Sequence, residues 1–346
     1  MTIKSSGSLT FTEIEAEWDN ASPFSLSEFY SGTSTVFSNA ADGDGNVIPS
    51  SGAISFSDFY NTTFFNASSH TGQAASGPGT ATNNRKGQQT SSTATVPTGA
   101  NAILITSSVG GGGGGIRGSD HKNVGEAAGD SGGSGGYIQT AFFTVTAGET
   151  ITFNVGHGGN DNHVFWATET YSQSSNPTDI NGGTTSASGS STGTLFTLTG
   201  GGGAFATDVG AFKSLRQDSP GAAGTVTLNA TPLSSGTTTG AVSVSSADTS
   251  NGSAGANSGQ GGGDNAQFNG ADGADSGAGS GGAGGTNNVK GASGNTGAGG
   301  GGGHSQSTIN GGGGDSHDDD HSPQGASTFG GLGGHGQLNY QFVRVV

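Results

Sequence analysis

The chain contains no cysteine, so it has neither a disulfide framework nor a thiolate metal site. Only nine of its 346 residues are lysine or arginine, and its formal net charge is −16. Because phosphate binding requires a basic face, we expect neither nucleic acid nor an anionic membrane as a partner. No apolar run approaches the roughly 18 residues of a membrane span, and residues 1–10 lack a secretory pattern. We therefore expect synthesis in a cytoplasm and no membrane insertion.

Hydrophobic residues are also scarce, at 29% of the chain. Glycine, in contrast, occurs 72 times, about three-fold above its usual frequency of roughly 7%. Disordered chains are usually rich in charge, but only 10% of these residues are charged, and 18 phenylalanines are spread along the sequence. The composition therefore predicts a folded, mainly β protein with thin cores and extensive backbone-to-backbone packing.

Residues 1–65 hold most of the glutamates and contain an internal repeat. Residues 5–14 match residues 50–59, and a shorter copy lies at 24–30. In each copy a turn precedes a short apolar/polar alternation, and a Ser or Thr followed by an acid then fits the start of a helical turn. The pattern predicts a small compact module, which we expect to dock the chain onto a larger assembly.

Residues 66–91 are mostly small and polar, which is typical of a linker. Residues 92–346 are predicted to form a β-sandwich with long loops, in which 137–145 and 150–155 make a hairpin and the C-terminal strand returns to the first sheet. The predicted strands are two pieces within 95–106 on either side of the turn 97–99, followed by 137–145, 150–155, 195–198, 225–228, 241–244 and 337–346.

The glycines between Gly270 and Gly303 follow a period of three, interrupted only by Ser276 and Asn288. Three residues per turn is the repeat of the polyproline II helix, which has no internal hydrogen bonds. Without side chains, neighbouring helices of this kind can approach closely and exchange backbone hydrogen bonds. We therefore expect a polyglycine II-like helix bundle over residues 250–335, inserted in the sandwich; a flexible linker is the alternative.

No catalytic motif stands in a suitable context. Matches to Gly-x-Gly-x-x-Gly are expected by chance among so many glycines, and none follows a strand and opens a helix. A nucleotide-binding Gly-Lys-Ser/Thr sequence is absent, and no strand carries paired carboxylates suited to glycoside hydrolysis. We expect a protein that is not an enzyme and that needs no cofactor.

Two polar clusters are candidate sites. The first is the run 315–321, in which His317, His321 and Asp319 are candidate ligands for a divalent cation such as Zn, Ni or Mn; a solvated acidic loop is the alternative. The second is the stretch 157–171, where aromatic rings beside amides and carboxylates are typical of carbohydrate contact, or else cap a sheet. Together the candidate receptor-contact residues are His157, Asn160, Asp161, His163, Trp166, Tyr171, His317, Asp318, Asp319, Asp320 and His321.

Several of these segments resemble phage proteins. Residues 4–18 with 22–30, and the second copy at 48–60, resemble the opening module of tail and fibre-associated proteins of marine and cyanobacterial tailed phages. Residues 96–100, leading into polyglycine, and 146–150 resemble the glycine-rich domain of phage tail-fibre and adhesin proteins. The stretch 270–303 resembles the polyglycine-helix sandwich of tail-fibre tip adhesins in T-even-like phages.

The resemblance implies a virion protein of the tail fibre or tail tip. Residues 1–65 would bind other virion proteins, and loops of 92–346 would contact a host glycan or surface protein; analogy with phage fibres is compatible with a homotrimer. Two other functions stay open from sequence alone. One is decoration of the capsid or tail without receptor binding. The other is an ice-binding or matrix protein, which would need a flat, regular Thr or Ala face.

Overall fold

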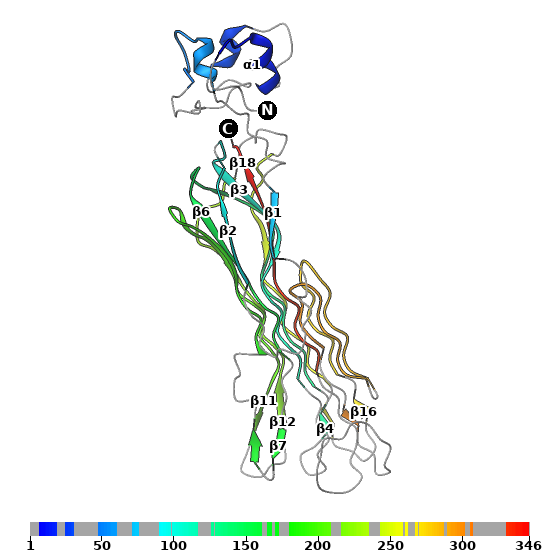
Figure 1. Cartoon of the computed structure of the whole chain (residues 1–346). Helices are drawn as coiled ribbons and strands as arrows, with labels where there is room; N and C mark the ends of the chain where they lie inside the picture. The colour runs from blue at the N-terminus through cyan, green and yellow to red at the C-terminus, as the bar shows by residue number, and fades with distance from the viewer. Residues whose placement is uncertain are drawn as a thin grey trace.

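The computed structural model describes residues 7–18, 25–30, 48–60, 71–75, 90–97, 99–116, 126–127, 129–160, 165–167, 170–172, 180–208, 216–234, 243–258, 260–261, 267–268, 270–286, 289–301, 305–306 and 330–345. Over these residues the protein is mainly β, as predicted, with two five-stranded antiparallel sheets. The molecule is elongated: an N-terminal module lies at one end, the two sheets follow, and glycine-rich segments lead from the sheets to the far end (Figure 1).

The N-terminal module contains one α-helix and two 3₁₀ helices: α1 (Phe11–Trp18), η1 (Leu26–Phe29) and η2 (Phe56–Phe59). The predicted caps are present in the outer two copies of the repeat. The backbone N–H of Thr10 donates to the Glu13 carboxylate at 2.7 Å, and that of Ser55 donates to Asp58, also at 2.7 Å. These reciprocal capping boxes satisfy N–H groups that a helix start leaves unpaired.

Corresponding residues of the three copies form the core of this module. Ile14, Phe29 and Phe59 follow the capping residue at the same spacing, and all three are fully buried together with Ile48. Phe29 and Phe59 meet edge to face, with ring centroids 5.9 Å apart. The repeat detected in the sequence is therefore a packing repeat.

Two antiparallel sheets form the central part of the protein. In the first sheet the spatial order is β1 (Thr71–Ala75), β18 (Gln337–Val343), β3 (Ala102–Val109), β5 (Tyr137–Thr144) and β14 (Asp248–Ser250). In the second sheet it is β13 (Val226–Leu228), β10 (Gly193–Leu198), β9 (Thr185–Gly189), β6 (Thr150–Val155) and β2 (Thr90–Thr95). Strand β1 thus lies within the range 66–91 that the composition indicated as a linker.

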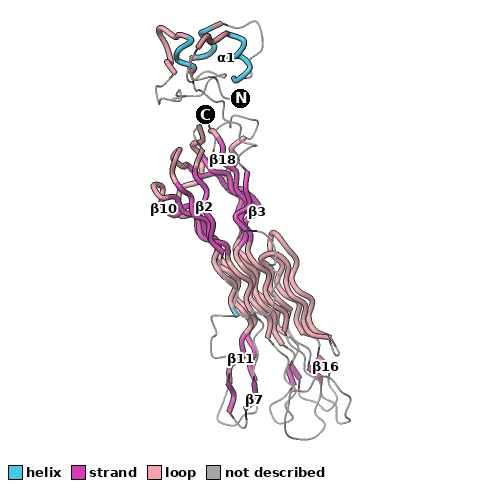
Figure 2. The backbone as a smooth tube through the Cα atoms, viewed as in Figure 1, coloured by secondary structure: helices cyan, strands magenta, loops and turns pink. Residues whose placement is uncertain are grey.

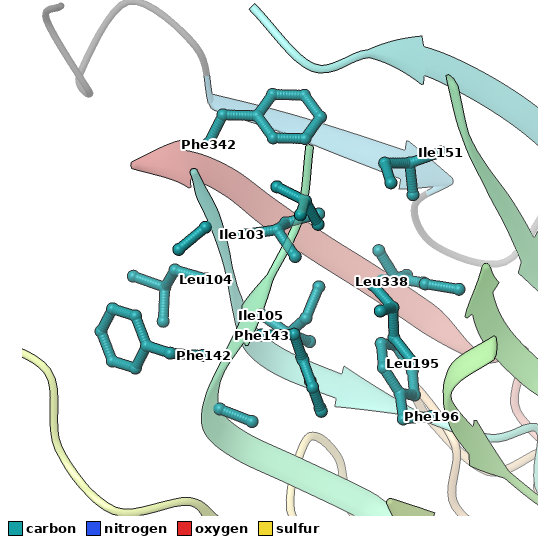
Figure 3. Close-up of a cluster of buried hydrophobic side chains, with 14 of the residues drawn as sticks. Ile103, Leu104, Ile105, Phe142, Phe143, Ile151, Leu195, Phe196, Leu338 and Phe342 are labelled. Carbon is teal, nitrogen blue, oxygen red and sulfur yellow. The ribbon is translucent and has the colours of Figure 1, made fainter. Parts of the chain in front are cut away.

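The apolar residues of the two sheets form one core. In Figure 3, Phe143 and Leu338 of the first sheet lie near Leu195 and Phe196 of the second. In the C-terminal strand Leu338, Phe342 and Val343 are buried, and Tyr340 stacks on Phe153 with a centroid distance of 4.3 Å. Strand β18 pairs with β3, so the C-terminal strand does return to an early strand of the domain.

The predicted hairpin of residues 137–155 is wrong. Strand β5 pairs with β3 and β14, whereas β6 pairs with β2 and β9, so the turn between them carries the chain from one sheet to the other. Both strands carry buried residues, and short-range alternation does not reveal which neighbour a strand will choose. The predicted strand 241–244 lies largely outside the described residues, and β14 begins only at Asp248.

Glu149 fixes this sheet-crossing turn. Its carboxylate is only 5% exposed and accepts the N–H groups of Thr146, Ser191 and Thr192 at 2.6, 3.0 and 3.1 Å. Burial by itself would raise the pKa of Glu149, but these bonds and one from the Thr192 hydroxyl outweigh it and lower the pKa below 4.5. The glutamate thereby joins the turn before β6 to the turn between β9 and β10.

The glycine-rich segments continue from the sheets as extended backbone and run side by side (Figure 2). Segment 110–116 shows how they bond: N–H groups three residues apart donate to the same neighbour. The donors are Gly110, Gly113 and Ile116 to segment 130–136, Gly111 and Gly114 to segment 180–183, and Gly112 and Gly115 to segment 331–334. Its carbonyl groups accept N–H groups from other segments. The donors are Gly201 and Ala204 of one segment, Gly159 of a second and Gly300 of a third.

Segment 130–136 repeats this rotation. Its N–H groups donate in turn to segments 253–256, 297–300 and 199–202, again with a period of three. Three-residue periodicity in backbone bonding is therefore present well outside residues 250–335, the range that glycine spacing indicated. Such bonding does not require glycine at every position: Ser131 and Ser134 of segment 130–136 are buried, and their hydroxyls accept N–H groups of segment 253–256.

Close packing between the glycine-rich segments excludes a side chain at positions such as Gly113. A Cβ atom on Gly113 would lie 1.9 Å from the carbonyl oxygen of Gly202, far inside van der Waals contact. At the edges, side chains replace the missing neighbour: Asp272 and Asp275 accept the N–H groups of Gly284 and Gly281, each at 2.7 Å. The interior is thus closed by backbone bonds and the periphery by polar side chains.

Candidate functional site

The far end of the molecule is formed by two-stranded ribbons that extend beyond the glycine-rich segments (Figure 1). The four pairs are β7 (Phe165–Ala167) with β8 (Thr170–Ser172), β11 (Phe205–Asp208) with β12 (Arg216–Ser219), β4 (Glu126–Ala127) with β15 (Gln260–Gly261), and β16 (Gln267–Phe268) with β17 (Ser305–Gln306). Each pair is antiparallel. The chain therefore reaches this end many times from segments that are distant in sequence.

Two predicted contact residues come together in one of these ribbons. Trp166 and Tyr171 occupy facing positions of β7 and β8. Facing residues of an antiparallel pair have Cβ atoms about 4.5–5.5 Å apart and lie on the same side of the ribbon. The ribbon thus brings positions 166 and 171 together in the backbone at the end of the molecule remote from the sheets (Figure 1).

Exposed apolar side chains lie at the same end. Among the described residues, the large apolar side chains exposed to solvent are Phe205 and Val289, at 40% and 57%. Phe205 opens β11. Val289 follows segment 270–286, whose Ala271 N–H donates to Gly129, next to the far-end strand β4.

His157 and Asn160 do not belong to this end. They lie in segment 156–160, which directly follows β6 next to the sheets, and both are partly buried. The ring nitrogen Nδ1 of His157 lies 3.0 Å from the carbonyl oxygen of Gly158. The sequence grouped these residues with Trp166 because they are close along the chain, but segment 156–160 follows β6 beside the sheets, whereas Trp166 lies in the far-end strand β7.

His335 is a neighbour of this histidine that sequence reasoning missed. Its Nδ1 accepts the backbone N–H of Gly158 at 3.1 Å. Burial, and next the charge of His157, lower the pKa of His335 below 6.5. The two histidines are 178 residues apart in a glycine-rich background, and the spacing of glycine alone gives no signal that would bring them together.

The remaining candidates, Asp161, His163 and all residues of the run His317, Asp318, Asp319, Asp320 and His321, lie outside the described residues. Within the described part of the chain, no group of three or more His, Asp or Glu side chains is placed to hold a metal ion. In that same part, no helix has the length and apolar character needed to cross a membrane.

Comparisons with known proteins give no relative: no protein-family model matches the chain, and no curated protein matches it.

Proposed function

We propose that the chain is a non-catalytic structural protein of a phage virion, part of the tail fibre or tail tip, whose far end attaches to the host surface. The observation that carries the proposal is that the two ends of the elongated molecule differ. The N-terminal module and the C-terminal strand lie at one end, and the ribbon with Trp166 and Tyr171 lies at the other (Figure 1). One end is thus free to dock to other virion proteins while the other is displayed.

The glycine-rich segments fit the role of a stiff spacer between the two ends. In our proposal they are polyglycine II-like helices packed as a bundle, which accounts for the three-residue rotation of donors in segments 110–116 and 130–136. Ordering glycine is costly, by about 0.5–1 kcal/mol per residue relative to Ala. Leaving a buried N–H or C=O unpaired costs about 1–3 kcal/mol, so a bundle that pairs them with several neighbours is favoured over loose chains.

Host contact at the far end would rely on many weak interactions. Trp166 and Tyr171 supply rings that stack on sugar faces or on apolar protein surface, and the exposed Phe205 and Val289 add apolar area. Several copies on one particle multiply weak single contacts without any new interaction. We therefore propose a host glycan or surface protein as the ligand.

Competition with the intact virus tests this function. Host cells are incubated with the purified full chain, and adsorption of the phage is then measured. We expect the full chain to reduce adsorption and the Trp166→Ala variant to reduce it less. Thr93→Ala, which truncates an exposed side chain on the second sheet, serves as the matched control and should compete like the unaltered chain. A full chain that binds virions but never competes would instead indicate capsid or tail decoration.

The metal proposal for His317, His321 and Asp319 is tested separately. Calorimetric titration of the full chain with Zn, Ni or Mn should give heat that disappears in the His317→Ala variant. No heat with any of the three cations would exclude this site.

A further inference from the structure

Two histidines from distant parts of the chain contact the backbone of the same residue, Gly158. Gly158 donates its N–H to Nδ1 of His335 at 3.1 Å, and its carbonyl oxygen lies 3.0 Å from Nδ1 of His157. The backbone of the His335 segment is held here as well, because Gly333 donates to Gly159 at 2.8 Å and Gly336 to Gly156 at 2.8 Å. The two imidazoles thus lie where segment 330–336 joins segment 156–160.

These contacts assign the protons. An Nδ1 atom that accepts an N–H must have a free lone pair, so His335 is neutral and carries its hydrogen on Nε2. A carbonyl oxygen can only accept, so His157 donates from Nδ1. If His335 took up a proton, its Nδ1 would become a donor pointing at the N–H of Gly158, and the hydrogen bond would be replaced by a repulsion.

We propose that His335, with His157, is an acid-sensitive latch that holds segment 330–336 against segment 156–160 and releases it when His335 is protonated. The proposal does not depend on the function of the far end. It concerns the junction between the sheets and the glycine-rich segments, where β6 and β18 enter and leave the layers.

The surroundings of the latch contain no competing charge in the described residues. Segments 110–116, 156–160, 180–184, 294–298 and 330–336 pack around it, through bonds such as Gly297 N–H to the His335 carbonyl at 2.8 Å. Apart from the two histidines, these segments consist of Gly, Ala, Ile, Leu, Asn and Thr, none of which titrates. Among the described residues of these segments, the other histidine is therefore the one titratable group near a protonated histidine.

The direction of the pH effect follows from the lowered pKa of His335. Burial is the larger cause of the shift and the charge of His157 the smaller one. A histidine whose pKa is lower in the closed state binds more protons when the latch is open. Closure is consequently complete above the ordinary value of 6.5 and weakens as the pH falls below it, until the lowered pKa of the closed state is reached.

Hydrogen exchange at the Gly158 amide measures the latch directly. In the full chain, protection of this amide, corrected for the intrinsic rate, should be constant above about pH 7 and should fall at lower pH by up to about tenfold per pH unit. In His335→Asn, the side-chain Oδ1 takes the place of Nδ1 and accepts the same N–H without titrating. Protection in this variant should stay constant from about pH 7 to about pH 5.

Two comparisons make the outcome specific. His157→Asn removes the charge that lowers the pKa of His335, so its total loss of protection should be smaller than in the unaltered chain. The amide of Gly148, bonded to Val96 at 2.9 Å within the sandwich, should keep its protection over the same range. An equal loss in His335→Asn, or a parallel loss at Gly148, would overturn the latch.

A titration of the unaltered chain by nuclear magnetic resonance keeps the test independent of how the variants fold. We expect a pKa below 6.5 for His335 and its neutral form protonated on Nε2. A pKa at or above 6.5, or a neutral form protonated on Nδ1, would contradict the proposal.

Discussion

Replacing Gly113 by alanine should destabilise the protein severely, although it adds only one methyl group. The new Cβ would lie 1.9 Å from the Gly202 carbonyl oxygen and 2.3 Å from its carbon. Both are backbone atoms, so the neighbouring segment would have to retreat by more than about 1 Å to reach ordinary contact. Gly202 cannot retreat freely, because it accepts from Gly133 at 2.9 Å and donates to Ala222 at 2.7 Å.

The magnitude follows from those two bonds. A shift of about 1 Å takes an N–H···O contact of 2.8 Å beyond hydrogen-bonding distance, and each buried group left unpaired costs about 1–3 kcal/mol. The substitution offsets about 0.4–1 kcal/mol of this loss, because alanine has fewer conformations than glycine in the unfolded chain. The net loss should be about 2–5 kcal/mol, a large part of the 5–15 kcal/mol that typically stabilises a protein.

Thermal and urea unfolding of the full chain, followed by circular dichroism, measure this loss. At roughly 2–4 °C per kcal/mol for a domain of this size, the Gly113→Ala midpoint should fall by about 4 °C or more. Ser280→Thr is the matched control, since it adds a methyl group to an exposed side chain of the same region and should change stability by less than about 0.5 kcal/mol. Equal midpoints for the two variants would refute the close backbone packing.

Other parts of the fold give smaller, distinct effects. Glu149→Gln should lower the free energy of unfolding in urea by about 1.5–3 kcal/mol at neutral pH, because it weakens charge-assisted hydrogen bonds. Since the pKa of Glu149 is lowered in the folded protein, the difference in stability between the two chains should disappear as the pH falls below 4.5 and through that lowered pKa. Tyr60→Phe removes the hydroxyl that donates to the Gly7 carbonyl and should cost about 0.5–1.5 kcal/mol in the same assay. Replacing both Asp272 and Asp275 by alanine should change stability by less than about 1 kcal/mol yet speed hydrogen exchange at the two amides they accept.

Local patterns predicted local structure well. Local patterns predicted the strands that became β6, β10 and β18, and a Ser or Thr followed by an acid predicted the helical turns of the N-terminal module. In both cases the deciding interactions lie within a few residues. Strand pairing was less predictable. The sequence around Glu149 predicts a hairpin turn, but the Glu149 carboxylate accepts N–H groups from a second turn about 40 residues away.

The glycine-rich segments mark the limit of sequence reasoning. A glycine run carries no side chain to choose a partner, so its spacing predicts backbone bonding but not which segments bond. Segment 130–136 was not recognised because Ser131 and Ser134 interrupt it, yet their hydroxyls accept the N–H groups of Ala256 and Ser253 at 2.8 Å. Likewise nothing in the sequence links His157 to His335.

Labelling of intact virions with an antibody against residues 92–346, viewed by electron microscopy alongside an adsorption assay, tests the proposed function most directly. The proposal predicts label at fibre ends or the tail tip together with blocked adsorption. Label spread over the capsid or the tail wall, with adsorption unchanged, would contradict it and would leave a decoration protein.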